Sequence, residues 1–378
     1  MKNFVDRQLR PAIRKRLDDR KALIIKGARQ VGKTTLIGEV IGNQPGVLQV
    51  DGDDPNDRLL WGNIGKELLQ RVIGASRYVV VDEAQRIENI GLAVKMVVDG
   101  KFPVKMILSG SSSLNLASTL NEPLTGRKWT FELFPFSWAE IVQAQGFATA
   151  IKRLDELLIF GCYPEVVTAG EDKEVLLQEI AASYLYKDIL EYGDIRKPDL
   201  LVKLLRAIAY QIGGEVSYQE LALLLGVDHK TVQRYIQLLE DSYVLFRLPP
   251  LSTNPRKEIS TSRKIYFFDN GIRNAVINDF SPLGQRNDRG QLWENYMITE
   301  LYKWQRNTGR AGQFYFWRNR HQAEVDLVIS AGGNYHAYEF KYSTKKKARF
   351  PAAFLERYTP VQTSVVHPGN FYELLESR

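Results

Sequence analysis

Three short apolar runs in the first third of the chain are separated by longer, mostly polar segments. They are Ala22–Ile25, Tyr78–Val81 and Val104–Leu108. Continuous apolar runs of this length are typical of strands buried on both faces of a parallel sheet. The segment from Thr34 to Val40 follows the first run and has the pattern of a helix start. The pattern therefore predicts an α/β core that is built on a parallel sheet.

The middle of the chain changes to helical spacing. Residues 151–197 are rich in Leu, Glu, Ala and Lys, with an interruption at Gly161–Pro164. Ser217 and Glu220 then have the spacing of a capping box, which predicts the start of a helix. A turn at Gly226 separates that helix from a second one with a single apolar face. The residues of that face are Val232, Ile236 and Leu239. Two short helices joined through a glycine predict a helix-turn-helix.

Composition and charge limit the class of protein. The chain has 378 residues, of which 44% are hydrophobic and 25% charged, as in an ordinary globular protein. A chain of this length is expected to form roughly two to four domains. No apolar run approaches the about 18 residues that cross a bilayer, so we expect no membrane partner. The single cysteine, Cys162, allows no internal disulfide, and we expect a cytoplasmic protein.

The N-terminal segment has no apolar core of a signal peptide and predicts a basic amphipathic helix instead. Leu9, Ile13 and Leu17 share one face of that helix. Its basic residues are Arg7, Arg10, Arg14, Lys15 and Arg16. The net charge of +7 permits a polyanionic partner without requiring one.

The strongest motif lies directly after the first predicted strand. Its residues spell G-x-x-x-x-G-K-T-T, and they are Gly27, Ala28, Arg29, Gln30, Val31, Gly32, Lys33, Thr34 and Thr35. Between a strand and a helix, such a P-loop wraps a triphosphate with backbone N–H groups at the helix N-terminus. Lys33 is then expected to contact the β- and γ-phosphates, and Thr34 to hold Mg²⁺. The sequence predicts a site for ATP with Mg²⁺.

A pair of carboxylates follows the second predicted strand. Asp82 is expected to be the partner of Thr34 at the Mg²⁺ ion, and Glu83 to polarise an attacking water. A site that only binds nucleotide needs the first carboxylate alone, so the pair favours hydrolysis. The alternative is a polar strand end without a catalytic role.

Two further candidates follow the third predicted strand. The segment Ser109–Ser113 places hydroxyls at the strand's carboxyl end, and one of them, for which we take Ser111, would sense the γ-phosphate or orient the water. A plain turn is the alternative. Arg127 is expected to stabilise transition-state charge at a neighbouring subunit's γ-phosphate.

These motifs resemble one family over nearly the whole chain. The segments GARQVGKTT, YVVVDEAQ, ILSGSSS, LTGR and FELFPFSWAE are similar to those of bacterial and archaeal AAA-type ATPases. The similarity continues through GCYPEVV, YVLFRLPP, FFDNGIRN and LWENYMITEL. It implies an AAA-type core over residues 1–148, a helical lid or linker over 149–199, a winged helix over 200–281 and a last domain over 282–378. It also suggests a homo-oligomer, a ring or a dimer.

The predicted winged helix is a candidate for DNA binding. Segments 243–248 and 264–268 would pair as the wing, with a basic loop between them. Lys230 and Arg256 would contact phosphates, and Gln233 or Arg234 would contact base edges. The alternative is a module that docks proteins, because winged helices also do this.

The last domain resembles the PD-(D/E)XK nuclease fold, an α/β fold of restriction endonucleases. Glu294 lies on a predicted helix, Asp326 on a strand, and Glu339 and Lys341 on the return strand of a hairpin. Asp326 and Glu339 would hold Mg²⁺, Lys341 would position the attacking water, and Glu294 would complete the site. Strands that alternate apolar and charged residues are also common at any half-exposed sheet.

Two function classes remain. One is an ATP-driven nucleic-acid enzyme, in which the nucleotide state controls DNA contact and the last domain also cuts. The other is a regulatory or scaffold ATPase whose C-terminal domains only dock partner proteins. We favour the first class.

Overall fold

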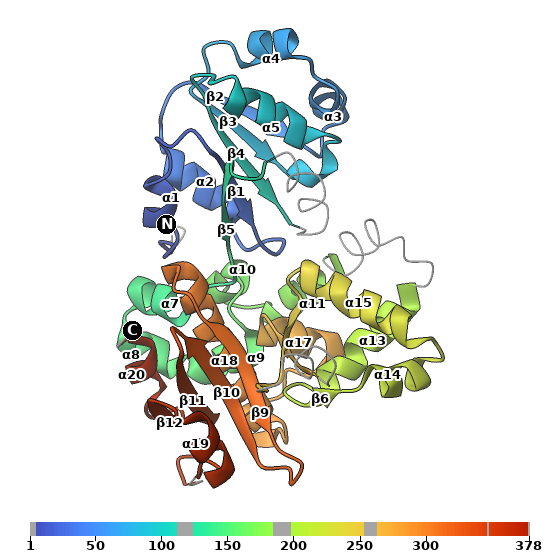
Figure 1. Ribbon diagram of the computed structural model, residues 1–378, viewed down its shortest axis with the longest axis vertical. Coiled ribbons are helices and arrows are strands. Elements are labelled where there is room, and N and C mark those ends of the chain that lie inside the picture. The colour runs from blue at the N-terminus through green and yellow to red at the C-terminus, as the bar shows by residue number, and fades with distance from the viewer. Residues whose placement is uncertain (1–4, 112–123, 184–197, 253–262, 346–347, 377–378) are drawn as a thin grey trace.

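The computed structural model describes residues 5–111, 124–183, 198–252, 263–345 and 348–376 (Figure 1). The N-terminal core lies at one end of the long axis, and the middle and C-terminal regions lie at the other. Arg256 lies outside the described residues.

The N-terminal core is a five-stranded sheet in the order β2-β3-β4-β1-β5, with every pair of neighbours parallel. Its strands are β1 (Ala22–Lys26), β2 (Val47–Asp51), β3 (Tyr78–Asp82), β4 (Lys105–Gly110) and β5 (Lys128–Glu132). Its helices are α1 (Arg10–Arg14), α2 (Lys33–Ile41), α3 (Pro55–Gly62), α4 (Lys66–Ile73) and α5 (Ile90–Asp99), with a 3-10 turn, η1 (Ala84–Arg86). The predicted α/β core with a parallel sheet is confirmed.

The alternation of side chains along β1 explains the two apolar layers of the core. Leu23 and Ile25 pack with α1 and α2 on one face, whereas Ala22 and Ile24 pack with α3, α4 and α5 on the other. All four side chains are fully buried. A strand that is covered on both faces has no polar side, which is why its sequence is a continuous apolar run.

In its described residues, the middle region consists of helices and a small antiparallel sheet in the order β6-β8-β7. The helices after the core are α7 (Trp138–Gln145), α8 (Phe147–Lys152), α9 (Leu154–Phe160), α10 (Pro164–Thr168) and α11 (Lys173–Ser183). They are followed by α13 (Pro198–Tyr210), β6 (Glu215–Val216), α14 (Tyr218–Leu225), α15 (His229–Asp241), β7 (Leu245–Leu248), β8 (Arg263–Phe267) and α17 (Asn270–Ile277). The order of elements from α13 to β8 is helix, strand, helix, helix, strand, strand.

The C-terminal region is a four-stranded mixed sheet in the order β12-β11-β10-β9. Its elements are η3 (Leu283–Gln285), α18 (Arg289–Thr308), β9 (Gln313–Arg318), β10 (Glu324–Ala331), β11 (Asn334–Phe340), α19 (Ala352–Tyr358), β12 (Gln362–Val366) and α20 (Phe371–Glu376). β10 is antiparallel to both β9 and β11, and β12 is parallel to β11. Helices α18 and α20 pack on one face of the sheet, and α19 packs on the other.

Two of the family-like segments meet at a buried junction within the middle region. The Asp269 carboxylate accepts a hydrogen bond from the Cys162 amide at 2.7 Å. Asn270 and Asn274 donate to the carbonyls of Leu158 and Ile159 at 3.1 and 2.7 Å. Burial raises the pKa of Asp269 to about 6. The segments GCYPEVV and FFDNGIRN therefore hold α9 against α17.

Candidate functional sites

The P-loop has the geometry that its glycines predict. Gly27 lies so close to the segment directly after β5 that a Cβ atom there would sit 2.1 Å from the Leu133 carbonyl oxygen. Gly32 has φ +91°, in the left-handed region, and α2 begins at the following residue, Lys33. The loop thus ends at a helix N-terminus, where free N–H groups point toward an anion.

The Lys33 side chain folds into this loop. Its ammonium group donates hydrogen bonds to the carbonyls of Gly27 at 2.9 Å and Ala28 at 2.8 Å. Within the same loop Ala28 and Val31 are buried, whereas Gln30 and the helix residues Thr34 and Thr35 are exposed, and Arg29 is half-buried. The lysine charge is therefore placed inside the loop that the sequence assigns to the phosphates.

Asp82 connects the ends of three elements. Its carboxylate accepts hydrogen bonds from the Thr34 hydroxyl at 2.8 Å, from the Glu83 amide at 3.0 Å and from the Ser109 hydroxyl. The Thr34 and Asp82 oxygens are hard ligands of the kind that Mg²⁺ prefers. This donor set fits the predicted Mg²⁺ position. Ser109, which the sequence offered only as one of a serine cluster, is the member that holds Asp82.

Glu83 lies beside a second cluster of polar side chains. It has φ +44°, a left-handed conformation that is rare for a residue with a Cβ atom. Its carboxylate accepts hydrogen bonds from Ser111 at 3.3 Å and from the Gln85 amide. Gln85 Oε1 is buried and has no hydrogen-bond partner among the described residues. Sequence reasoning missed Gln85, although it belongs to the same motif as Asp82.

Arg127 is not brought to the P-loop of its own chain. It precedes β5, and the neighbouring Lys128 pairs with Ala22 at the start of β1, whereas the P-loop follows the end of β1. Its guanidinium donates to the Asp99 carboxylate at 2.6 Å, and this contact raises the pKa of Arg127. Arg127 therefore lies at the amino ends of the strands, whereas Lys33 lies at their carboxyl ends.

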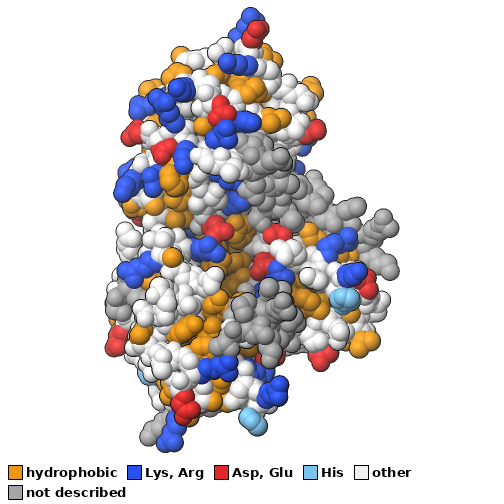
Figure 2. Space-filling view, in the orientation of Figure 1, with side chains coloured by type: hydrophobic (Ala, Val, Ile, Leu, Met, Phe, Trp, Pro, Cys, Tyr) orange, Lys and Arg blue, Asp and Glu red, His pale blue; other side chains and the backbone are white. Residues whose placement is uncertain are grey.

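Three of the four residues predicted to contact DNA lie on α15. Lys230, Gln233 and Arg234 are all exposed on the face of α15 opposite its buried apolar stripe. Figure 2 shows Lys, Arg and His side chains over this part of the molecule. On the preceding helix, α14, Leu223 and Leu224 are 84% and 68% exposed, so an apolar patch lies beside the basic one.

Three of the four residues predicted for the C-terminal site converge. The Lys341 ammonium lies 3.2 Å from the Asp326 carboxylate and 2.7 Å from the Glu339 carboxylate. Asp326 also accepts a hydrogen bond from the Phe340 amide at 2.8 Å. It lies where the register between β9 and β10 shifts, and such bulges redirect side chains.

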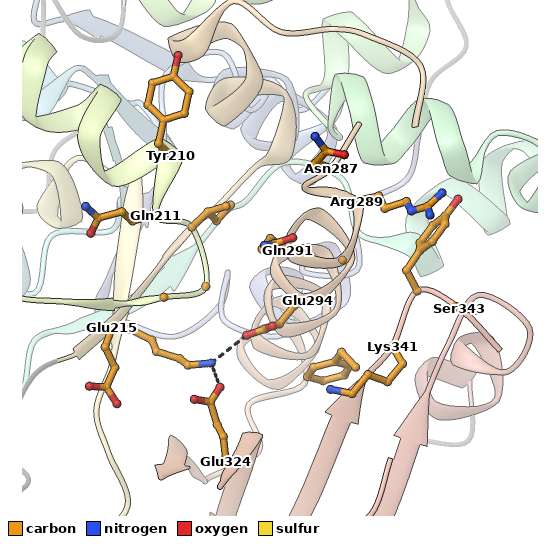
Figure 3. Close-up of a pocket in the computed structure, with 17 residues that line it drawn as sticks. Tyr210, Gln211, Glu215, Asn287, Arg289, Gln291, Glu294, Glu324, Lys341 and Ser343 are labelled. Atoms are coloured by element: carbon orange, nitrogen blue, oxygen red, sulfur yellow. Dashed lines mark hydrogen bonds and ion pairs between the residues drawn. The ribbon is translucent and has the colours of Figure 1, made fainter. Parts of the chain in front are cut away.

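The fourth residue, Glu294 on α18, has a partner that the sequence did not reveal. Lys264, from β8 of the middle region, forms ion pairs with Glu294 at 3.2 Å and with Glu324 (Figure 3). The Tyr266 hydroxyl donates to Glu294 at 2.6 Å. A cavity of about 870 Å³ lies between the middle and C-terminal regions and is lined by Lys264, Glu294 and Lys341, among others.

Burial changes the acidity of this site. It raises the pKa of Glu294 to about 7, with a further upward contribution from the Asp326 charge and an opposing one from Lys264. Burial and the Asp326 charge also raise the pKa of Glu339 to about 7, against the effect of Lys341. Across the described part of the chain, no group of three or more His, Cys, Asp or Glu side chains is arranged to hold a metal ion.

Comparisons with known proteins follow the same division of the chain. A family model described as an AAA domain matches residues 19–142. Two models of domains of unknown function, DUF8612 and DUF4143, match residues 151–283 and 289–376. The predicted domain boundaries stay predictions.

The chain also resembles uncharacterized relatives in sequence and a solved structure in fold. The chain is 27% identical to the uncharacterized protein Rv2008c of Mycobacterium tuberculosis over 366 residues, covering 94% of this chain and 78% of the relative. It is 24% identical to an uncharacterized protein of Haemophilus influenzae, with 56% of each chain covered. The Walker-type ATPase PABY2304 of Pyrococcus abyssi has a similar fold, with a TM-score of 0.51, 15% identity and coverage of 72% of this chain and 96% of that one.

The parallel sheet, the P-loop and the AAA match together define an AAA-type P-loop ATPase domain. The chain is similar to Walker-type ATPases in fold. Among the described helices, none is long and apolar enough to cross a membrane.

Proposed function

We propose that this protein binds ATP with Mg²⁺ at its P-loop and hydrolyses it. The observation that carries the proposal is the 2.8 Å contact between Thr34 and Asp82 beside a loop that already encloses the Lys33 ammonium. The Lys33 ammonium, the Thr34 hydroxyl and the Asp82 carboxylate thus belong to one site. The AAA match over residues 19–142 supports the same class of chemistry.

Each residue has a separate role in this proposal. Lys33 binds the terminal phosphates, and Thr34 and Asp82 hold the metal ion. When bound, Mg²⁺ would neutralise part of the negative charge of the phosphates. Glu83 accepts a proton from the attacking water, and Ser111 and Gln85 hold the Glu83 carboxylate in place.

Steady-state ATP hydrolysis tests the proposal directly. Glu83→Gln should lower the rate about 100-fold or more, because a positioned general base contributes about that much. Glu88→Gln is the matched control, because Glu88 is an exposed acid in the same segment. Equal rates for wild type and Glu83→Gln, or hydrolysis that survives removal of Mg²⁺ by a chelator, would remove the proposal.

We further propose that the ATPase acts on DNA in the cytoplasm. Exposed Lys230, Gln233 and Arg234 on α15 support this role. Lys230→Ala should weaken duplex binding and reduce the slope of log K against log salt by about 0.9, because each phosphate contact releases counterions. Lys203→Ala, an exposed lysine on α13, is the control. Binding that is absent, or insensitive to salt, would favour docking of a partner protein instead, for which exposed Leu223 and Leu224 are the natural contacts.

Phosphodiester cleavage at the C-terminal site is a second candidate function. The convergence of Asp326, Glu339 and Lys341 favours it. The ion pairs of Lys264 oppose it, because this lysine already neutralises Glu294. Cleavage of plasmid DNA by wild type that is lost in Asp326→Asn would support a nuclease. If wild type and Asp326→Asn leave DNA equally intact in Mg²⁺ and Mn²⁺, the site is a binding platform.

We propose a homo-oligomer in which Arg127 serves the nucleotide site of a neighbouring copy. Arg127 lies at the amino ends of the strands, away from the P-loop of its own chain, which supports a contact with the nucleotide of a neighbouring chain. Mixing Arg127→Ala with Lys33→Ala should restore hydrolysis above the level of either variant alone. Failure of the mixture to gain activity would reject the role of Arg127.

A further inference from the structure

Arg7 is a buried charged residue that none of the motifs includes. The sequence predicted a basic amphipathic helix for this segment, but the helix, α1, begins only at Arg10. Arg7 is 7% exposed and lies between Val5 and Leu9, which belong to the apolar core. Its charge is therefore removed from water, and burial lowers the pKa of Arg7. A buried guanidinium needs partners of its own.

The partners of Arg7 are a carboxylate and two carbonyls from separate elements. It donates to Glu140 on α7 at 3.1 Å, to the Val31 carbonyl at 3.0 Å and to the Phe134 carbonyl. Val31 is a P-loop residue, and Phe134 follows β5. One side chain thus ties the phosphate-binding loop to the segment that leaves the ATPase sheet.

The contact with Val31 bears on nucleotide binding through the peptide plane. The Val31 carbonyl and the Gly32 N–H belong to one planar trans unit and point in opposite directions. By holding the carbonyl on the core side, Arg7 directs the Gly32 N–H away from the core, into the loop where phosphate oxygens are bound.

The same guanidinium begins a polar connection to the C-terminal region. Glu140 also accepts hydrogen bonds from the amides of Gln8 at 2.8 Å and Ser137 at 3.0 Å. The next amide, of Trp138, donates to Glu300 on α18 at 2.7 Å. Lys303 on α18 donates to the Phe136 carbonyl at 3.0 Å. Helix α18 carries Glu294 nearer its N-terminus, so the connection runs from the P-loop to the helix of the C-terminal site.

We propose that Arg7 is a positioning residue of the nucleotide site, which orients the Gly32 amide by holding the Val31 carbonyl. The inference rests on the proposed binding of ATP at the P-loop. Arg7 does not contact the nucleotide; it acts through the loop. The Glu140 carboxylate holds Arg7 in place.

The test compares full-length variants by equilibrium binding of a fluorescent ATP analogue with Mg²⁺. Arg7→Met alone would leave the Glu140 carboxylate buried without its cation, which destabilises the fold. The informative variant is therefore Arg7→Met with Glu140→Gln, because the new side chain is neutral and its single oxygen can still accept from the Gln8 amide. Its NH2 group cannot accept from the Ser137 amide, a loss that Glu140→Gln alone shares. Glu140→Gln alone keeps Arg7 and its contact with Val31. Arg10→Met removes one charge from the same segment, where Arg10 pairs only with Asp6 among the contacts found in the described residues.

The expected result is a graded loss of affinity, measured at a temperature at which every variant is folded. Glu140→Gln and Arg10→Met should bind within about twofold of wild type, and the double variant about tenfold more weakly, the worth of one charged hydrogen bond. In hydrolysis, the double variant should raise KM while kcat stays within about twofold, because the loop binds substrate and transition state alike. Arg7→Lys with Glu140 intact should recover part of the affinity.

Two outcomes would overturn the proposal in distinguishable ways. If the double variant binds the analogue as tightly as Glu140→Gln does, Arg7 is a structural residue only. If wild type binds no better than Lys33→Ala, ATP binding itself fails, and the role of Arg7 fails with it.

Discussion

The P-loop site and the C-terminal site both bring lysines and carboxylates together, but they balance these charges differently. At the P-loop, the Lys33 ammonium contacts backbone carbonyls, and Asp82 receives neutral hydroxyl and amide donors. At the C-terminal site, each carboxylate of the predicted set is paired with a lysine of the chain, Lys341 or Lys264. The first arrangement places a lysine where a polyanion such as ATP can meet it. The second is already neutralised from within.

The charged residues of the C-terminal site stabilise the fold, whereas Lys33 at the P-loop is placed to bind a ligand. Buried ion pairs are strongly destabilising when one partner is removed, because the other remains as an uncompensated charge. We expect the Lys33 ammonium, which backbone carbonyls hold, to add little to the free energy of folding, because it is placed to bind phosphate and not to stabilise the fold. The comparison therefore predicts that lysine substitutions will separate the two sites by their effect on stability.

The largest effect is expected at Lys264. Lys264→Met leaves Glu294 and Glu324 without their cation and should lower the free energy of unfolding by about 3–5 kcal/mol. Urea denaturation measures this value, with Lys345→Met, an exposed lysine, as a control expected to change it by less than about 0.5 kcal/mol. A loss of less than about 1 kcal/mol at Lys264 would contradict the view that the site is neutralised from within.

A smaller effect is expected from the acidity of Glu294. Because burial raises its pKa to about 7 in the folded protein, the folded state binds a proton more tightly than the unfolded chain. Stability from this group is fully present below about pH 4.5, the ordinary range of a glutamate, and is lost as pH rises through about 7. Its size is about 3 kcal/mol.

Glu294→Gln isolates this contribution, because the amide still accepts from Tyr266. The difference in unfolding free energy between wild type and Glu294→Gln should shift in favour of the variant between about pH 4.5 and 7. Two parallel curves of stability against pH would show that Glu294 titrates normally.

The smallest effect on stability is expected at Lys33. Lys33→Met removes a buried ammonium that contacts the carbonyls of Gly27 and Ala28, so we expect a change of less than about 1 kcal/mol. The same urea experiment measures it. A loss comparable with that of Lys264→Met would erase the distinction between the two sites.

The P-loop site was predictable because its parts are local. Strand, loop and helix follow one another from Ala22 to Ile41, and the spacing of the glycines fixes the backbone around Lys33. The parallel sheet followed from continuous apolar runs. Asp82 could be assigned because the carboxyl ends of parallel strands meet at one edge.

Contacts between distant segments were not predictable. Arg7 was predicted only as a basic residue of an amphipathic helix, and Lys264 only as part of a wing strand. The sequence does not show which carboxylates on other elements a buried cation will contact. Lys264 meets Glu294 and Glu324 only because β8 packs against α18. Periodicity does not report such packing, so the hairpin carrying Asp326 and Glu339 was found without the Lys264 side chain beside it.

The most direct test of the account is equilibrium binding of ATP with Mg²⁺ to wild type, Lys33→Ala and Lys341→Ala in one experiment. The account predicts that Lys33→Ala weakens binding about tenfold or more, whereas Lys341→Ala stays within about twofold of wild type. If Lys33→Ala binds like wild type, or Lys341→Ala loses affinity to the same extent, the P-loop is not the nucleotide site that the structure suggests.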